Sequence, residues 1–147
     1  MNGERDLATL QREMAPQLHA PTFVYCCFPD FQVPSGIRPI CTFREAEGLT
    51  AIVEKSQAQE SNTSYCFEAR LITLRVHSSL EAVGFMALVA GQLAQARIPC
   101  NVVAGYHHDH LFVPTERADD ALSLLCALST ADTDRVTPSE AVELTSR

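Results

Sequence analysis

The fold is decided by residues 69–114, ARLITLRVHSSLEAVGFMALVAGQLAQARIPCNVVAGYHHDHLFVP, in which strand, helix and hairpin signals follow one another without a gap. From residue 72 to 77, apolar and polar side chains alternate, which is typical of a strand with one buried face. We expect a helix directly after this strand, because Ser78 and Glu81 have the spacing of a capping box. Its predicted buried stripe consists of Val83, Ala87, Ala90, Leu93 and Ala94.

The second part of the stretch predicts a β-hairpin. Pro99 ends the helix, and residues 100–106 and 110–113 have the composition of two strands. Residues 107–109 between them are polar and suit a turn. A strand, a crossover helix and a hairpin that returns beside the first strand make up most of a ferredoxin-like α+β sandwich.

The rest of the chain carries similar signals. We expect, in order, a helix at 4–14, a strand at 22–28, a Pro-rich loop, a hairpin of strands 40–44 and 49–54, a short helix within 55–64, and a helix at 115–128. The order of elements divides the chain into an N-terminal unit at 1–65, a C-terminal unit at 66–128 and a polar, disordered tail at 129–147.

In this division the first unit lacks an opening strand and the second lacks a closing strand. Either the strand that begins near Cys66 serves both units, or a partner chain supplies the missing edge. We therefore expect a homodimer that pairs through sheet edges or helix faces.

Three segments resemble the ACT-domain family, specifically its small stand-alone members built of two ACT-like units. The segments are VHSSLEAVG at 76–84, PCNVVAGYHHDHLFVP at 99–114 and REAEGLT at 44–50. The resemblance implies a tandem ferredoxin-like sandwich of antiparallel sheets with helices on one face. It also implies a regulatory module that binds an amino acid or a similar metabolite where two units meet. The ligand-binding residues that it implies are His77, Ser78, Ser79, Leu80, Glu81, Asn101, Val102 and Val103.

The residues themselves suggest two candidate sites. A helix beginning at 77–81 would offer free backbone amides to a carboxylate or phosphate, although Ser78 in such a position is also an ordinary helix cap. The second site is the cluster His107, His108, Asp109 and His110, of which we assign the last three to a ligand pocket, with Asp109 as partner for an ammonium group. The alternatives for this cluster are a polar turn or a metal site, and consecutive strand residues converge poorly on one ion.

Composition excludes several classes of function. The chain has 147 residues, 46 % of them hydrophobic, and a formal charge of −7 without basic runs, which argues against nucleic acid and membrane surfaces as partners. No signal-peptide pattern or apolar span is present, and the six cysteines fit buried thiols in a reducing cytoplasm. Cys100 with His108 is the conceivable nucleophile and base, but no motif around Cys100 supports its activation.

We therefore interpret the sequence as a cytoplasmic, non-catalytic regulatory module without a cofactor, which binds an amino acid and acts on an unidentified effector protein. Two alternatives stay open at this point. One is a metal-dependent enzyme or metal-binding protein that uses residues 107–110, and the other is a dimerisation module without a ligand.

Overall fold

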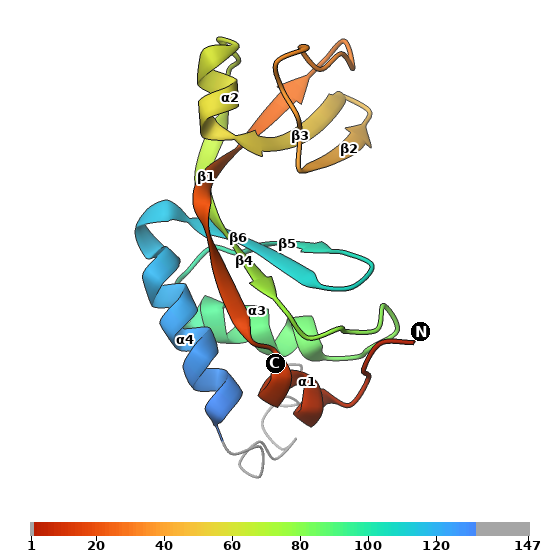
Figure 1. Cartoon of the computed structure of the whole chain (residues 1–147), viewed down its shortest axis with the longest axis vertical. Helices are drawn as coiled ribbons and strands as arrows, with labels where there is room; N and C mark the ends of the chain where they lie inside the picture. The colour runs from red at the N-terminus through yellow and green to blue at the C-terminus, as the bar shows by residue number, and fades with distance from the viewer. Residues whose placement is uncertain (1, 132–147) are drawn as a thin grey trace, which may run out of the picture.

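The computed structural model describes residues 2–131, which form one curled antiparallel sheet with helices packed against it (Figure 1). The sheet has the strand order β2-β3-β1-β4-β6-β5. In chain order the elements are α1 (Leu7–Glu13), β1 (Pro16–Phe28), β2 (Cys41–Glu45), β3 (Gly48–Glu54), α2 (Lys55–Glu60), β4 (Cys66–Leu74), α3 (Phe85–Gln95), β5 (Asn101–Ala104), β6 (Asp109–Pro114), the short 3-10 helix η1 (Thr115–Arg117) and α4 (Ala118–Thr130).

The two long strands β1 and β4 lie side by side at the centre of the sheet and connect its two ends (Figure 1). They pair antiparallel from Pro16↔Leu74 to Tyr25↔Cys66. The second part of β1, from Phe23, also pairs with β3, whereas the second part of β4, from Ala69, also pairs with β6. Each long strand therefore contributes to both ends of the sheet.

This arrangement agrees with the alternative in which the strand that begins near Cys66 serves both halves, and it adds β1 as a second shared strand. The order β2-β3-β1-β4 contains a complete four-stranded set for the first half, and β1-β4-β6-β5 contains one for the second. No strand from a partner chain is needed, because β1 opens the first set and also completes the second. The sequence-based expectation missed this because β1 begins at Pro16, where two prolines interrupt the strand pattern. The unit boundary at 65/66 stays a prediction.

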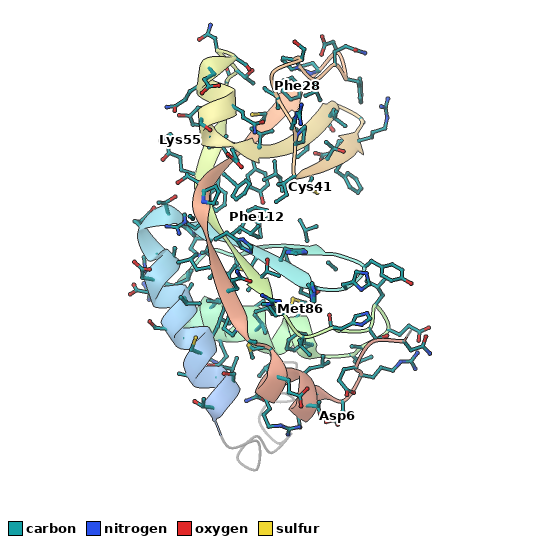
Figure 2. The ribbon with its side chains drawn as sticks, in the orientation of Figure 1. Asp6, Phe28, Cys41, Lys55, Met86 and Phe112 are labelled. Carbon is teal, nitrogen blue, oxygen red and sulfur yellow. The ribbon has the colours of Figure 1, made fainter. Side chains whose placement is uncertain are left out.

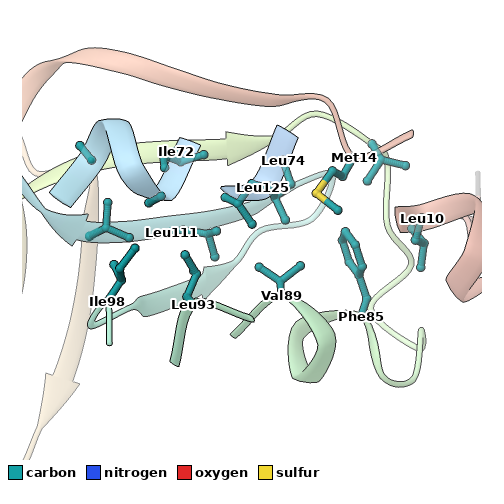
Figure 3. Close-up of a cluster of buried hydrophobic side chains, with 14 residues drawn as sticks. Leu10, Met14, Ile72, Leu74, Phe85, Val89, Leu93, Ile98, Leu111 and Leu125 are labelled. Carbon is teal, nitrogen blue, oxygen red and sulfur yellow. The ribbon is translucent and has the colours of Figure 1, made fainter. Parts of the chain in front are cut away.

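The main hydrophobic core lies between the sheet and helices α1, α3 and α4 (Figure 3). Its strand side includes Ile72, Leu74 and Leu111, and its helix side includes Leu93 and Leu125. Side chains alternate between the two faces of a strand, so the apolar residues at even positions of β4 point to these helices. The alternation predicted from the sequence for this strand is confirmed.

Two smaller clusters complete the packing. The first, which includes Val24, Val53 and Ala58, lies at the other end of the sheet, beneath α2 and the loop that carries Ile37. The second lies on the opposite face of the sheet, where Leu71 and Phe112 are almost completely buried although no described helix covers them. The curl of the sheet buries this face against itself, and Figure 2 shows Phe112 between the two ends of the molecule.

The predicted start of the central helix is wrong. The helix α3 begins at Phe85 and not near Ser78, and its N-cap is Gly84, which adopts a positive φ of 90° that favours glycine. Ser78 does not cap the helix, because its side chain turns inward. Val83, expected in the buried stripe, is 85 % exposed in the loop before the helix.

The other expected elements are present with shifted ends. Both hairpins, the short helix α2 and the helix near residue 118 occur, and α4 continues to Thr130, two residues into the segment predicted as a disordered tail. The predicted tail beyond residue 131 lies outside the described residues. None of the helices in the described part of the chain is long and apolar enough to cross a membrane.

Removing a core side chain tests this packing. Leu93 is fully buried on α3, and we expect Leu93→Ala to lower the free energy of unfolding by about 2–5 kcal/mol, because the lost contacts leave a cavity. The exposed Val83→Ala should change it by less than about 0.5 kcal/mol. Urea denaturation followed by circular dichroism measures both values, and similar values for the two variants would contradict the described core.

Candidate ligand-binding site

The segment His77 to Glu81, which we call the HSSLE loop, follows β4 and is held by the N-terminal segment of the chain. The backbone amide of Glu4 donates to His77 O at 2.8 Å, and the amide of Ser79 donates to Glu4 O at 2.9 Å. Gly3 lies so close that a Cβ there would be 2.6 Å from Ser79 N. Glu4 and Ser78 thus form an isolated parallel β-bridge, and the loop is not a helix start.

A buried polar contact joins the HSSLE loop to the sheet. Ser78 Oγ donates to Asp109 Oδ2 at 2.6 Å, and both residues are less than 10 % exposed. A carboxylate buried at this depth needs hydrogen-bond donors, and Ser78 supplies one. Oδ1 of Asp109 has no hydrogen bond to another side chain within residues 2–131. This oxygen is therefore free to accept a donor from a ligand.

The turn between β5 and β6 lies against the HSSLE loop. The ring centroids of His77 and His107 are 5.0 Å apart, and those of Tyr106 and His107 are 4.9 Å apart. His108 Nδ1 lies 3.1 Å from Val76 O, and because a carbonyl only accepts, Nδ1 is the protonated nitrogen. The two segments thus form one surface.

Two adjoining pockets open on this surface. The first, of about 370 Å³, is mainly polar and is lined by the HSSLE loop, by Arg5 and by Tyr106. The second, of about 190 Å³, lies at the start of α3 and reaches Asp109. Ser78, Ser79 and Leu80 line both pockets, so the HSSLE loop is their common wall.

The lining of the smaller pocket combines groups of opposite polarity. Gly84, Phe85 and Met86 form the beginning of α3, where no side chain caps the backbone amides. The N-terminus of a helix favours negative charge. Asp109 lines the same pocket and carries a carboxylate. A molecule with a carboxylate and an ammonium group close together matches this arrangement.

The predicted site residues separate into three groups, and His108 lies apart from them. His77, Ser78, Ser79, Leu80 and Glu81 lie together around the two pockets, and Asp109 joins them. Asn101 and Val102 are exposed on the edge strand β5 and line none of the described pockets near this loop. Val103 and His110 face the opposite side of the sheet and line another cavity there. His108 contacts the loop through its backbone bond to Val76.

The histidines do not converge on one point. His107 packs against His77, His108 binds a carbonyl, and His110 Nδ1 lies 3.0 Å from Thr73 Oγ1. In the part of the chain that the structure describes, no three His, Cys, Asp or Glu side chains are arranged to hold a metal ion. His107 and His108 lie in the turn before β6, and within β6 the neighbours Asp109 and His110 point to opposite faces.

The conceivable cysteine nucleophile is poorly activated. Cys100 packs against the main core, and burial raises the pKa of its thiol to about 11. At neutral pH almost none of it is the reactive thiolate. His108, its proposed base, uses Nδ1 to bind Val76 O.

Several residues of the site were missed in the sequence. Gly3 and Arg5 reach the loop from the other end of the chain, where Arg5 forms an ion pair with Glu81. Such a long-range contact leaves no local signal. The start of α3 was missed because Gly84 was treated as an ordinary helix residue. A glycine directly before a continuous helical pattern is the signal that indicates this boundary.

Comparison with known proteins identifies the family. Two family profiles described as the ACT domain match residues 2–70 and residues 67–127. The chain belongs to the ACT-domain family and carries the domain twice. The four residues shared by the two matches lie in β4, the strand that both halves of the sheet use. No curated protein matches the sequence significantly.

Solved structures show the same fold. A Vibrio cholerae protein of unknown function, described as a possible transport protein, is 42 % identical, with a TM-score of 0.74 over 84 % of this chain and 95 % of that one. A protein from Agrobacterium tumefaciens is 13 % identical, with a TM-score of 0.67 over 78 % and 87 % of the two chains. The regulatory subunit of aspartate kinase from Thermus thermophilus is 11 % identical, with a TM-score of 0.60 over 77 % and 95 %. The last two share the fold alone.

The contact between Ser78 and Asp109 predicts a loss of stability on mutation. Ser78→Ala leaves the buried carboxylate without its donor and should lower the free energy of unfolding by about 1–3 kcal/mol. Ser79→Ala removes the neighbouring hydroxyl, which accepts only a local amide, and should have a much smaller effect. Equal effects in urea denaturation would contradict a special role for the buried pair.

The environment of His110 predicts a pH dependence. Burial, and then the nearby His108, lowers the pKa of His110 below its ordinary value of 6.5. His110 therefore binds a proton more readily in the unfolded chain than in the folded chain. Its contribution to the free energy of unfolding is present above about pH 6.5 and is lost as the pH falls below this value.

The free energy of unfolding should decrease less between about pH 7.5 and pH 5.5 in His110→Gln than in the unchanged protein, because glutamine does not titrate. The exposed His107→Gln serves as control. An unchanged pH slope in His110→Gln, measured by urea denaturation at each pH, would contradict the assignment.

Proposed function

We propose that the protein is a cytoplasmic, non-catalytic regulatory module that binds an amino acid at the HSSLE loop. The carboxylate of the ligand lies at the uncapped start of α3, and its ammonium group donates to Asp109. The side chain of the amino acid extends into the larger polar pocket beside Arg5 and Tyr106. Membership of the ACT-domain family supports a regulatory, ligand-binding role of this kind.

The observation that carries the proposal is the pair of opposite polarities in the lining of the smaller pocket. The first turn of α3 supplies donors without a side-chain cap, and Asp109 supplies a buried acceptor with one oxygen unoccupied by another described side chain. Charge-assisted hydrogen bonds of both signs fix the orientation of a zwitterion. A plain carboxylic acid or a plain amine would satisfy only one of them.

The surface around the pockets supports a homodimer. Leu80, Val83 and Tyr106 are exposed by 68 %, 85 % and 72 %, and they surround the site. Large exposed apolar side chains that gather beside a ligand site are typical of interaction surfaces. In the proposed dimer the second copy covers these residues and closes the pockets over the ligand. In this proposal an effector protein senses the altered dimer surface.

A binding screen with a matched pair of variants tests the proposal. We expect one or a few of the twenty standard amino acids to raise the melting temperature, since a ligand at about 100 times its Kd adds about 2.7 kcal/mol to stability. Titration calorimetry then gives Kd for the amino acid that shifts melting most. Asp109→Asn keeps the shape of the side chain and removes its charge, and it should weaken binding at least about tenfold.

The control is Asp119→Asn, which removes the same charge from the exposed surface of α4 and should leave Kd unchanged. Equal binding by Asp109→Asn and the unchanged protein would contradict the assigned ammonium site. A chain that dimerises and binds none of the amino acids would instead indicate a dimerisation module without a ligand.

A further inference from the structure

A second cavity, of about 270 Å³, lies on the opposite face of the sheet from helices α1, α3 and α4. Its apolar walls come from Pro21, Phe23, Ile40, Leu71, Val103 and Phe112. These residues belong to both ends of the curled sheet. Figure 2 shows two of the lining residues, Cys41 and Phe112, on the two facing parts of the sheet. The cavity is therefore formed by the curl itself and shares no lining residue with the HSSLE loop pockets.

Three polar side chains meet at one end of this apolar cavity. His19 Nε2 lies 2.9 Å from Thr73 Oγ1, which lies 3.0 Å from His110 Nδ1. Thr73 is 7 % exposed, and burying a polar group among apolar ones costs free energy that these contacts only partly return. If residue 73 contributed only to packing, valine would fill the same space without the cost of burying a hydroxyl group.

The backbone is arranged to bring His19 into the cavity. The pairing of β1 with β4 shifts by two residues between Leu18 and Thr22, so His19 lies in a bulge. Its carbonyl, which the bulge removes from the ladder, accepts from Arg70 Nε at 2.8 Å and from Arg70 Nη2 at 2.6 Å. Bulges commonly turn a side chain toward a functional site.

The hydrogen-bond chain determines what the two rings offer to a ligand. Thr73 has a single hydroxyl proton, so it donates to one histidine and accepts from the other. When both rings are neutral, the ring that donates to Thr73 presents an acceptor at its outer nitrogen, and the other ring presents a donor. Burial lowers the pKa of His110, which keeps this ring neutral at physiological pH. A hydroxyl group both donates and accepts, so it can pair with the outer nitrogen of either ring.

We propose that this cavity is a binding site for a small neutral molecule with an apolar body of about one aromatic ring and a single hydroxyl group, which pairs with one of the two histidines, His19 or His110. The volume supports this size, because an apolar cavity of about 150 Å³ already accommodates benzene. An anion is disfavoured, since the cationic Arg70 is engaged by the His19 carbonyl. The site is independent of the amino-acid site proposed above.

Nuclear magnetic resonance of the full chain at about pH 7.5 tests the proposal with three probes that share a methyl-substituted aromatic ring. They are 4-methylphenol, toluene, which lacks the hydroxyl, and 4-methylbenzoate, which carries a charge. We expect 4-methylphenol to cause saturable shifts of amide signals in β1, β4 and β6 near His19, Thr73 and His110. Toluene should bind about three- to tenfold more weakly, the effect of one net hydrogen bond, and 4-methylbenzoate should bind more weakly than 4-methylphenol.

Two variants complete the test. Thr73→Val removes the hydroxyl that orders the two rings and should reduce the preference for 4-methylphenol over toluene. Thr42→Val, the same change at an exposed position of β2, should keep it. If Thr73→Val fails to fold, the comparison of the three probes on the unchanged protein still tests whether the cavity prefers a ligand with a hydroxyl group.

Three results with the probes would overturn the proposal: no saturable shift near the cavity, equal affinity for toluene and 4-methylphenol, or tighter binding of 4-methylbenzoate than of 4-methylphenol. The same amide shifts on raising the protein concentration without a probe would also overturn it, because a second copy would then fill the cavity.

Discussion

The antiparallel pairing of β1 with β4 is the constraint on which the rest of this structure depends. Ten residues of β1, from Pro16 to Tyr25, lie along β4, and each strand pairs along its other edge with a different neighbour, β3 or β6. Two ACT domains in one chain therefore share their central strands and form one sheet. This pairing fixes the end of β4 at Leu74, and the end of β4 sets the position of the HSSLE loop, which begins at His77. The bulge at His19 belongs to the same ladder, so both proposed sites depend on it.

The period of two along β4 and β6 separates these sites to opposite faces of the sheet. Thr73 pairs with His110, and the next pair along the ladder is Leu74 with Asp109. Asp109 therefore points to Ser78 and the helices, whereas His110 points to Thr73 and the concave face. A run of residues that looks like one polar cluster in the sequence thus serves two different environments. The sheet therefore lies between the pockets at the HSSLE loop and the cavity that His110 lines.

The sequence predicted the elements well and their boundaries less well. The alternation in β4, both hairpins and the α+β class are confirmed, because these signals are local. The start of α3 was wrong, since Ser78 forms a tertiary contact that competes with capping. Strand β1 was predicted too short, because its prolines lie at its start and at the bulge. For the candidate site, the structure brings residues 77–81 and Asp109 together, whereas Asn101, Val102, Val103 and His110 lie elsewhere. Their role in ligand binding stays a prediction. Contacts from Gly3 and Arg5 depend on the folded chain and could not be predicted from local patterns.

Native-state hydrogen exchange is the most direct test of the central claim that the two halves form one unit through β1 and β4. The amides to compare are those of β1 and β3 in the pairing Val24↔Val53 and those of β4 and β6 in the pairing Ile72↔Leu111. Shared strands predict that both groups open with the same free energy, equal to that of global unfolding. If the amides of β3 opened at a cost lower by about 2 kcal/mol or more while those of β6 stayed protected, the halves would unfold separately and the account would be contradicted.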